Sequence, residues 1–344
     1  MKRMISMGLI LILISFLNGG MAADLDVSTL YKDRDVEDGW KMEEVETIRL
    51  SENGAEVSDT DMVTVDGSTV TILEEGDYLL TGNWKGQIVV SVSEEEKVRL
   101  ILQNVTIDSP EGPAILEKSA DKLVLTLDAG STNKLTDHTE MNLGEEIAAA
   151  AVYAQDDLSI NGEGTLIVEG HAKNGIHSKA DLVIASGNLE VHAENDAVKG
   201  RNSVLVLGGN ITITGNGDGL VSNRDNKDDK GWVVIAGGTI SVRTGDGAEN
   251  GKQKNASSRK GLKAETSLTI LDGHFVLDTE DDGIHARDIT IQNGTFEISS
   301  GDDAIQAEEK LILAGGDIWI RLCDEEIRGE KVEAKDGVIR TDAE

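Results

Sequence analysis

The chain has 344 residues, of which 64 are acidic and 32 basic, giving a formal net charge of −32. A polyanion of this kind repels nucleic acid and anionic lipid, so we expect neither as a partner, although plain solubility or adaptation to salt would need the same charge. Cys323 is the single cysteine, so no internal disulfide can form. With 3% aromatic residues and two prolines, the composition points away from an ordinary globular enzyme and towards a repeat protein.

Residues 1–22 have the pattern of a secretory signal peptide. Two basic residues precede an apolar run from Met7 to Leu17, and small residues stand at a plausible cleavage point after Ala22. The apolar run is about half as long as a membrane span needs to be. The sequence therefore predicts an exported protein without a membrane span, either secreted or held at the cell surface.

Residues 23–60 contain no repeat and are predicted to form an N-terminal extension or cap. We expect residues 28–45 to contribute a short helix over the open core, because both ends of a solenoid need covering. Weak copies of a repeat follow within residues 63–127, so the predicted repeat domain covers residues 61–344.

The clearest copies of the repeat have a period of about 22 residues, which is typical of a solenoid. A small residue followed by an aliphatic one recurs at successive steps of 22, 22, 42, 22 and 21: Gly175-Ile176, Ala197-Val198, Gly219-Leu220, Gly261-Leu262, Gly283-Ile284 and Ala304-Ile305. The glycine before the last strand of each repeat gives an independent set of steps. Together the two anchors indicate that the step of 42 is one repeat carrying two insertions, within residues 223–230 and 245–260.

Inside one repeat the pattern is that of β-strands. Residues 203–207 and 211–214 form two short alternating segments joined by glycines, and residues 197–199 supply a third. Three such short strands in one period correspond to one coil of a parallel β-helix, an all-β solenoid. Each coil buries its inward Val, Ile and Leu side chains only against its neighbours, so several coils are required.

One corner of the predicted coil is acidic at almost every level. The carboxylates stand just before the aliphatic anchor: Asp196, Asp218, Asp281, Asp282, Asp302, Asp303 and Asp324. Parallel coils lie about 4.8 Å apart, and two charges at that distance repel by about 3.5 kcal/mol at an effective dielectric near 20. A cation between them relieves this repulsion, and oxygen ligands suit calcium rather than zinc. A single aspartate equally well only forms a turn, but the two consecutive pairs on adjacent coils favour calcium.

The residue after the aliphatic anchor is predicted to point outward. The residues that share this position are Lys199, Lys263, His177, His285 and Gln306. Such a ladder could receive uronate carboxylates and sugar hydroxyls, or form ordinary solvated surface. Trp232 follows the first insertion and could stack on a sugar ring. The insertions could be binding loops or simply polar flaps.

Motifs of other chemistries are absent from the sequence. It has no Gly-x-Ser-x-Gly, no phosphate-binding glycine loop, no cysteine pair and no His-x-x-x-His spacing. We therefore predict no catalytic residues from motifs alone.

Several segments resemble a family of exported carbohydrate-binding β-helix proteins known from cellulose-degrading clostridia. They are residues 259–265 (Arg-Lys-Gly-Leu-Lys-Ala-Glu), 267–270, 280–286 (Glu-Asp-Asp-Gly-Ile-His-Ala), 230–240 and 79–82. The resemblance covers about residues 60–320. It implies a right-handed parallel β-helix, bound calcium, and binding of cellulose or acidic sugars such as polygalacturonate.

The family is similar in shape to calcium-dependent pectate lyases, in which aspartates on neighbouring coils hold calcium and a lysine abstracts a proton. By this resemblance Asp281, Asp282, Asp302 and Asp303 would be the calcium positions, and Lys263 or Lys199 the base. A lysine base needs a depressed pKa, and an acidic surround acts in the opposite direction. We therefore predict a monomeric, non-catalytic, calcium-containing protein that binds acidic or plant cell-wall polysaccharide. The alternatives are a pectate-type lyase and a structural surface or adhesion solenoid.

Overall fold

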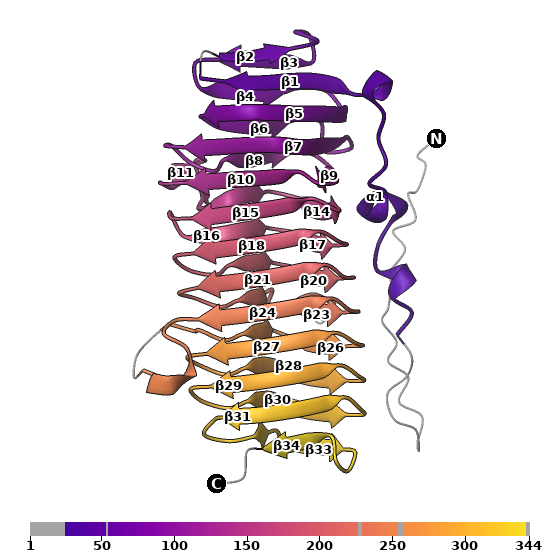
Figure 1. The fold of residues 1–344 in the computed structure, drawn as a ribbon, viewed down its shortest axis with the longest axis vertical. Helices are drawn as coiled ribbons and strands as arrows, with labels where there is room; N and C mark the ends of the chain where they lie inside the picture. Colours follow the sequence, from indigo (N-terminus) through magenta and orange to yellow (C-terminus); the bar gives the residue numbers. More distant parts are fainter. Residues whose placement is uncertain (1–24, 53, 226–228, 254–256, 342–344) are drawn as a thin grey trace, which may run out of the picture.

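A computed structural model describes residues 25–52, 54–225, 229–253 and 257–341. The predicted signal peptide, residues 1–22, lies outside these ranges. None of the helices in the described ranges combines the length and hydrophobicity that crossing a bilayer requires. The molecule is all-β apart from a few short helical turns, and its strands stack along one long axis (Figure 1). Parallel pairs predominate, as the sequence predicts.

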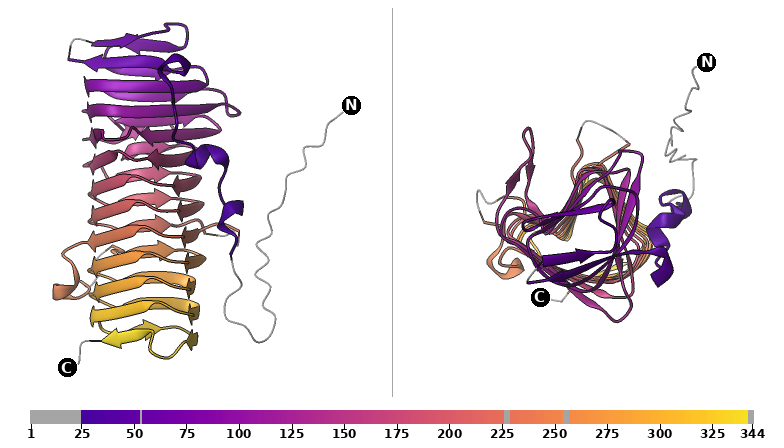
Figure 2. Two further views of the ribbon diagram at one scale, coloured as in Figure 1. Left: turned by 45° about the vertical axis from the view of Figure 1, so that its right-hand side comes forward. Right: turned by 90° about the horizontal axis from the view of Figure 1, so that it is seen from above.

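The strands form three faces around the axis, seen end-on in Figure 2. In chain order the first face contains β4 (Thr69–Ile72), β6 (Gln87–Ser91), β8 (Ile115–Ser119), β13 (Ala150–Ala154), β16 (Asn174–Ser178), β19 (Val198–Gly200), β22 (Leu220–Ser222), β25 (Leu262–Ala264), the start of β28 (Ile284–Ile291), the start of β30 (Ile305–Leu313) and β32 (Ile327–Arg328). This face carries the predicted ladder of outward residues.

The second face follows the first along every coil. It contains β1 (Glu46–Ser51), the starts of β5 (Gly76–Lys85) and β7 (Lys97–Ser109), β9 (Lys122–Leu127), β14 (Asp157–Gly162), β17 (Asp181–Ile184), β20 (Ser203–Val206), β23 (Trp232–Ile235), β26 (Ser267–Ile270), the ends of β28 and β30, and β33 (Lys331–Ala334). Its outer side is partly covered by the N-terminal segment.

The third face closes the coil. It contains the ends of β5 and β7, then β10 (Thr132–Asp137), β15 (Thr165–Gly170), β18 (Asn188–Ala193), β21 (Asn210–Gly215), β24 (Thr239–Thr244), β27 (His274–Thr279), β29 (Thr295–Ser300), β31 (Asp317–Leu322) and β34 (Ile339–Thr341). The short turns η1 (Val27–Thr29), η2 (Met42–Glu44) and η3 (Ala248–Asn250) lie outside the faces.

The pairing register confirms the two predicted insertions. Asn188 pairs with Asn210, a step of 22 in the numbering. Val204 pairs with Val233, a step of 29, because residues 223–230 add about seven. Leu220 pairs with Leu262, a step of 42, because residues 245–260 lie in the same coil. Both insertions therefore leave the stack without shifting the strands that follow them.

Stacked aliphatic side chains fill the interior. Ile176, Val198 and Leu220 pair in register on the first face and are fully buried. One continuous apolar cluster extends from Ile48 to Val338. Because each buried Val, Leu or Ile contributes about 1.5–3 kcal/mol, this column of like residues holds the parallel coils together.

The N-terminal part of the sheet begins earlier than the sequence suggests. β1 lies within the segment predicted as an extension, yet it pairs in parallel with β5. It also forms an antiparallel hairpin with β2 (Gly54–Val57), and β3 (Val63–Asp66) does the same with β4. These hairpins stand at the N-terminal end of the stack (Figure 1). A third, shorter hairpin extends from a later coil as a flap, and it pairs β11 (Met141–Asn142) with β12 (Ile147–Ala148).

The predicted helix over the open core is wrong in its position. α1 spans Asp33–Val36 and lies beside β14, on the flank of the stack rather than over its end (Figures 1 and 2). The reason is a buried charge: the Asp35 carboxylate accepts from Lys122 Nζ and from Ser159 Oγ, each at 2.5 Å. We call residues 25–45 the strap.

The strap also covers an apolar patch on the outer side of the second face. Val183, Leu205 and Val234 point outward from β17, β20 and β23 and are nevertheless buried. The strap side chains that pack near them are Leu25, Val27, Leu30 and Tyr31, and Trp232 and Leu207 join the same cluster. The segment thus spans several coils laterally.

Candidate functional site

The predicted acidic corner is a true column in the structure. On successive coils a backbone N–H donates to the carbonyl of the residue one coil further on, as from Gly175 to Asp196 at 3.2 Å and from Ala197 to Asp218 at 2.9 Å. The same backbone hydrogen bonds continue towards the C-terminal coils. We call the residues whose carbonyls accept them the acidic column: Asp196, Asp218, Lys260, Asp282, Asp303 and Glu325. Five of these six positions are acidic, and the exception is a lysine.

Lys260 was not singled out from the sequence, because it closes the long insertion. The sequence nevertheless contained a clue to its position. Lys260 directly precedes the small anchor residue Gly261, just as each aspartate of the column directly precedes the small anchor residue of its own coil. The side chain is buried, and its ammonium lies 3.0 Å from Asp281 Oδ1 and 2.5 Å from Asp282 Oδ2. A lysine therefore replaces an aspartate in the coil that carries the insertions.

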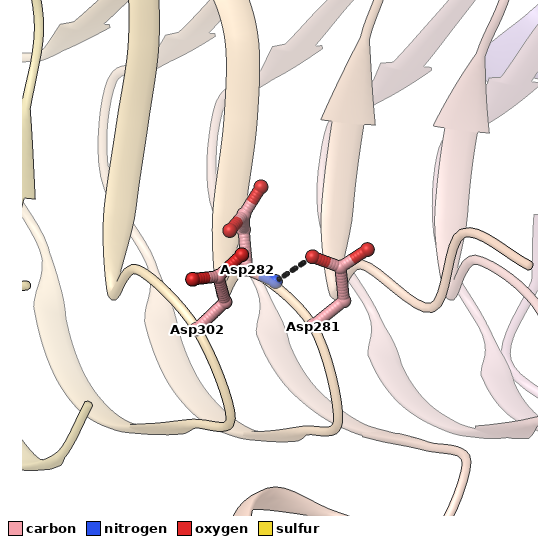
Figure 3. A group of neighbouring side chains, drawn as sticks. All are labelled: Asp281, Asp282 and Asp302. Atoms are coloured by element: carbon pink, nitrogen blue, oxygen red, sulfur yellow. Dashed lines mark hydrogen bonds between the residues drawn. The ribbon is translucent and has the colours of Figure 1, made fainter. Parts of the chain in front are cut away.

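Three carboxylates next to this lysine form the tightest acidic group of the described residues. Asp281, Asp282 and Asp302 each offer an oxygen, and these oxygens lie within 4.8 Å of one another (Figure 3). Asp281 and Asp282 come from the corner before β28, and Asp302 comes from the same corner one coil on. We call these three residues the aspartate cluster.

A second lysine reaches the aspartate cluster from the long insertion. Lys252 Nζ lies 2.8 Å from Asp281 Oδ1 and 2.6 Å from Asp302 Oδ2, and its side chain is 46% exposed. With three carboxylates and two ammonium groups, the cluster keeps a formal charge of −1. The sequence reasoning missed Lys252 as well, because nothing in the insertion's composition says where it folds back.

The carboxyl groups of Asp281 and Asp282 are ionised at neutral pH. Burial alone would raise the pKa of Asp282, but the His285 hydrogen bond and the Lys260 charge outweigh it and lower the pKa to about 2. Burial is likewise outweighed at Asp281, where Lys252 and Lys260 lower the pKa. Ionised oxygen ligands in such a group could hold a hard cation.

The predicted ladder lies on the first face, and its cations are paired with the column. His177 pairs in register with Lys199, and Lys263 with His285. Lys199 Nζ lies 2.8 Å from Asp196 Oδ2, Lys263 Nζ lies 2.8 Å from Asp218 Oδ2, and His285 Nδ1 lies 2.8 Å from Asp282 Oδ2. The two ladder lysines therefore neutralise Asp196 and Asp218, while the Asp282 carboxylate accepts a hydrogen bond from the His285 imidazole.

The remaining candidate residues are distributed differently. Asp303 is buried and accepts from Arg328 Nη1 at 3.2 Å, while burial raises its pKa. Asp324 is exposed and donates its backbone N–H to the Asp302 carbonyl at 2.9 Å. Trp232 begins β23 on the second face, half-buried in the patch under the strap, so it does not join the ladder.

Lys263 lacks the property that a catalytic base would need. Burial by itself would lower the pKa of its ammonium, but the Asp218 carboxylate outweighs burial and raises it. A protonated lysine that donates to a buried aspartate cannot take a proton from substrate at neutral pH.

Known proteins resemble this chain. A carbohydrate-binding domain-containing protein of Acetivibrio thermocellus is 35% identical over 226 residues, which are 62% of this chain and 79% of the relative. A polysaccharide lyase-like protein from C. thermocellum, solved as a gadolinium derivative, has a TM-score of 0.61 and 27% identity over 87% of this chain and 99% of its own. The resemblance proposed from the sequence is thereby confirmed.

A family model gives the same assignment. The model of the carbohydrate-binding domain-containing protein family matches residues 66–252 and 235–304, well over half of the chain. These matches span all three faces and include the aspartate cluster. The chain therefore belongs to the family of carbohydrate-binding domain-containing proteins.

Proposed function

We propose that this protein is an exported, non-catalytic polysaccharide-binding protein built as a right-handed parallel β-helix with coils of about 22 residues. In this proposal it binds acidic or plant cell-wall polysaccharide and holds calcium at Asp281, Asp282 and Asp302. The family membership and the regular pairing register support the fold and the ligand class. The observation that carries the calcium proposal is the surplus charge of the aspartate cluster.

Charge balance favours the exchange of Lys252 for a divalent cation. Three carboxylates with Lys260 alone have a formal charge of −2, which one calcium ion neutralises. Lys260 is too deeply buried to leave, with a side chain 11% exposed, whereas that of Lys252 is 46% exposed and comes from a surface insertion. The group thus has one fixed cation and one that can be displaced.

The donor set also fits calcium chemically. Calcium takes six to eight hard oxygen ligands in flexible geometry, and the corner supplies carboxylates from two coils. The polysaccharide lyase-like neighbour was solved as a gadolinium derivative, and gadolinium is likewise a hard cation that prefers oxygen. When bound, calcium would supply positive charge that can attract a uronate carboxylate.

The residues of the chain support binding rather than elimination. Lys263 and Lys199 are hydrogen-bonded to column aspartates, and the pKa of Lys263 is raised. Their role in the proposal is to hold the corner in place by neutralising Asp218 and Asp196. Asp303 is tied to Arg328 in the same way.

Calcium titration calorimetry tests the metal, and affinity electrophoresis in gels containing polygalacturonate or hydroxyethyl cellulose tests the ligand. We expect Asp281→Asn with Asp302→Asn to abolish calcium binding and to reduce retardation by polygalacturonate. The matched control is Asp66→Asn with Asp336→Asn, since both residues are exposed and removal of two carboxylates changes the net charge equally.

Three outcomes contradict parts of the proposal. Appearance of unsaturated product absorbance with polygalacturonate would make the protein a lyase. Calcium binding with a raised melting temperature, but no retardation on any polysaccharide, would make it a structural solenoid. Equal calcium affinity in the aspartate variant and the control would place the metal elsewhere.

A further inference from the structure

A second row of cations lies on the first face, two residues beyond the predicted ladder. Lys179 N donates to the Ala154 carbonyl and Arg201 N to the Ser178 carbonyl, each at 2.9 Å, so these residues occupy the same position on successive coils. Arg224 lies in the next coil but one position further along, two residues after β22 ends, because the residue equivalent to Arg201 there is Asn223. On a chain with two acidic residues for every basic one, this run of three cations is unusual.

The charges of Arg201 and Arg224 are not neutralised locally. The ladder cations contact column aspartates, and Lys179 contacts Glu146 of the flap. Within the described ranges no carboxylate lies within 4.0 Å of the guanidinium of Arg201 or Arg224. Arg201 and Arg224 therefore carry positive charge that no described carboxylate neutralises, whereas Lys199 and Lys263, which the sequence singles out, are paired with column aspartates.

Two largely buried neutral rings lie on the first face near Arg201. Tyr153 and His177 are in register on adjacent coils, and their rings meet edge to face with centroids 5.3 Å apart. Burial, reinforced by the nearby Lys199 and Arg201 charges, lowers the pKa of His177 to about 3, so the imidazole is neutral. Its buried Nε2 has no hydrogen-bond partner in the described part of the chain.

These groups match a sugar acid. Arginine presents a planar fork of donors that binds a carboxylate with two parallel hydrogen bonds. Successive coils are spaced by about 4.8 Å, so an extended chain lying along the axis meets the two arginines at neighbouring units. The residues between the ladder and the following cations, Ser178, Gly200 and Ser222, are buried and place no side chain on the outer surface.

We propose that Arg201 and Arg224, beside Tyr153 and His177, form a subsite that binds carboxylates of a polyuronate directly. The inference rests on the proposed polysaccharide binding and gives it a location. The subsite lies about 10–15 Å along the axis from the aspartate cluster, two to three coils at the usual spacing. It therefore works without a bridging calcium ion.

The test compares Arg201→Gln with Arg224→Gln against a control of equal charge change, Lys85→Gln with Lys335→Gln. Both control lysines are exposed and lie near the two ends of the stack. Affinity is measured by electrophoresis at fixed calcium in polygalacturonate and in its fully methyl-esterified form, which has the same backbone without charge. Melting temperatures verify folding, and Arg224→Gln alone serves if the double variant does not fold.

We expect the arginine variant to bind polygalacturonate at least about tenfold more weakly, and its affinity for the methyl ester to be unchanged. Equal affinities of the arginine variant and the control for polygalacturonate would overturn the subsite while leaving the proposed function intact. Wild-type binding to the methyl ester or to cellulose but not to polygalacturonate would also overturn it. No retardation of the wild type on any polysaccharide would remove the proposed function, and the subsite with it.

Discussion

Lys122 and Lys260 are both buried lysines, exposed by only 8% and 9%, but they differ in how closely carboxylates surround them. Lys122 contacts one carboxylate, Asp35, which also accepts from a serine hydroxyl. Asp157 lies further away at 4.0 Å, and burial raises its pKa to about 6. Lys260 contacts two carboxylates, and a third, Asp302, lies within 4.8 Å of both.

The difference separates a structural clamp from a cation site. At Lys122 one buried carboxylate, Asp35, is in direct contact, Asp157 lies 4.0 Å away with a side chain 34% exposed, and the close pair fixes the strap to the second face. At Lys260 the carboxylates outnumber the buried cation, and the balance is supplied by Lys252 from the surface. A buried lysine alone therefore does not reveal whether its role is structural or functional. The number of carboxylates close to it distinguishes the two roles.

The largest effect is expected from breaking the close pair of Lys122 and Asp35. Lys122→Met leaves Asp35 buried without a cation, which typically costs about 3–5 kcal/mol of unfolding free energy. Urea unfolding measures the loss. The control is Lys97→Met, whose half-exposed pair with Asp121 at 3.3 Å should be worth less than about 1 kcal/mol. Similar losses in the two variants would show that the strap is not held by Asp35.

A buried carboxylate with no lysine at all extends the comparison. Glu117 is fully buried and accepts from the backbone N–H of Asp156 at 2.9 Å, and burial raises its pKa to about 7. Between pH 4.5 and pH 7 the folded protein keeps a proton that the unfolded chain has lost. Glu117 therefore destabilises the fold progressively as pH rises through this window.

Glu117→Gln should remove that pH dependence. The amide oxygen can still accept from Asp156 but cannot ionise, so at pH 8 we expect the variant to be more stable than wild type by about 3 kcal/mol. Below pH 4.5 the two proteins should be equally stable. Urea unfolding at both pH values checks this, and a constant difference between them would contradict the assignment to Glu117.

Lys252 provides a smaller and more specific test of the surplus-charge argument. Lys252→Ala removes the cation that calcium would displace, so we expect calcium affinity to rise by about tenfold with little change in metal-free stability. Calcium titration calorimetry gives the affinity. Lys85→Ala removes the same charge at a distant exposed site and should leave it unchanged, whereas a rise of the same size there would mean only a long-range charge effect.

The smallest expected effect concerns Trp232. Because this side chain lies in the patch under the strap, Trp232→Ala should leave retardation by polygalacturonate unchanged even though the residue is aromatic. Affinity electrophoresis beside the double variant Arg201→Gln with Arg224→Gln provides the comparison. Weaker binding in the Trp232 variant would indicate that the strap leaves the second face during binding.

The sequence was sufficient for features that repeat. The regular period, both insertions and the registration of Asp282 with Asp303 follow from stacked parallel strands, in which one coil's pattern predicts the next. Features that occur once were not predictable. The position of the strap depends on a contact between Asp35 and Ser159, which are far apart in the sequence. The second lysine of the aspartate cluster, Lys252, reaches Asp302 only because of the conformation of an irregular insertion.

The strap also sets an order in time. Asp35 is separated from Ser159 by 124 positions, and the patch under Leu25 and Tyr31 includes Val234. Coils pair only with their neighbours and can form as the chain emerges from its N-terminus. The first described residues, in contrast, have no place to bind until β14, β17, β20 and β23 exist. The strap therefore docks late, after most of the stack on which it rests has been built.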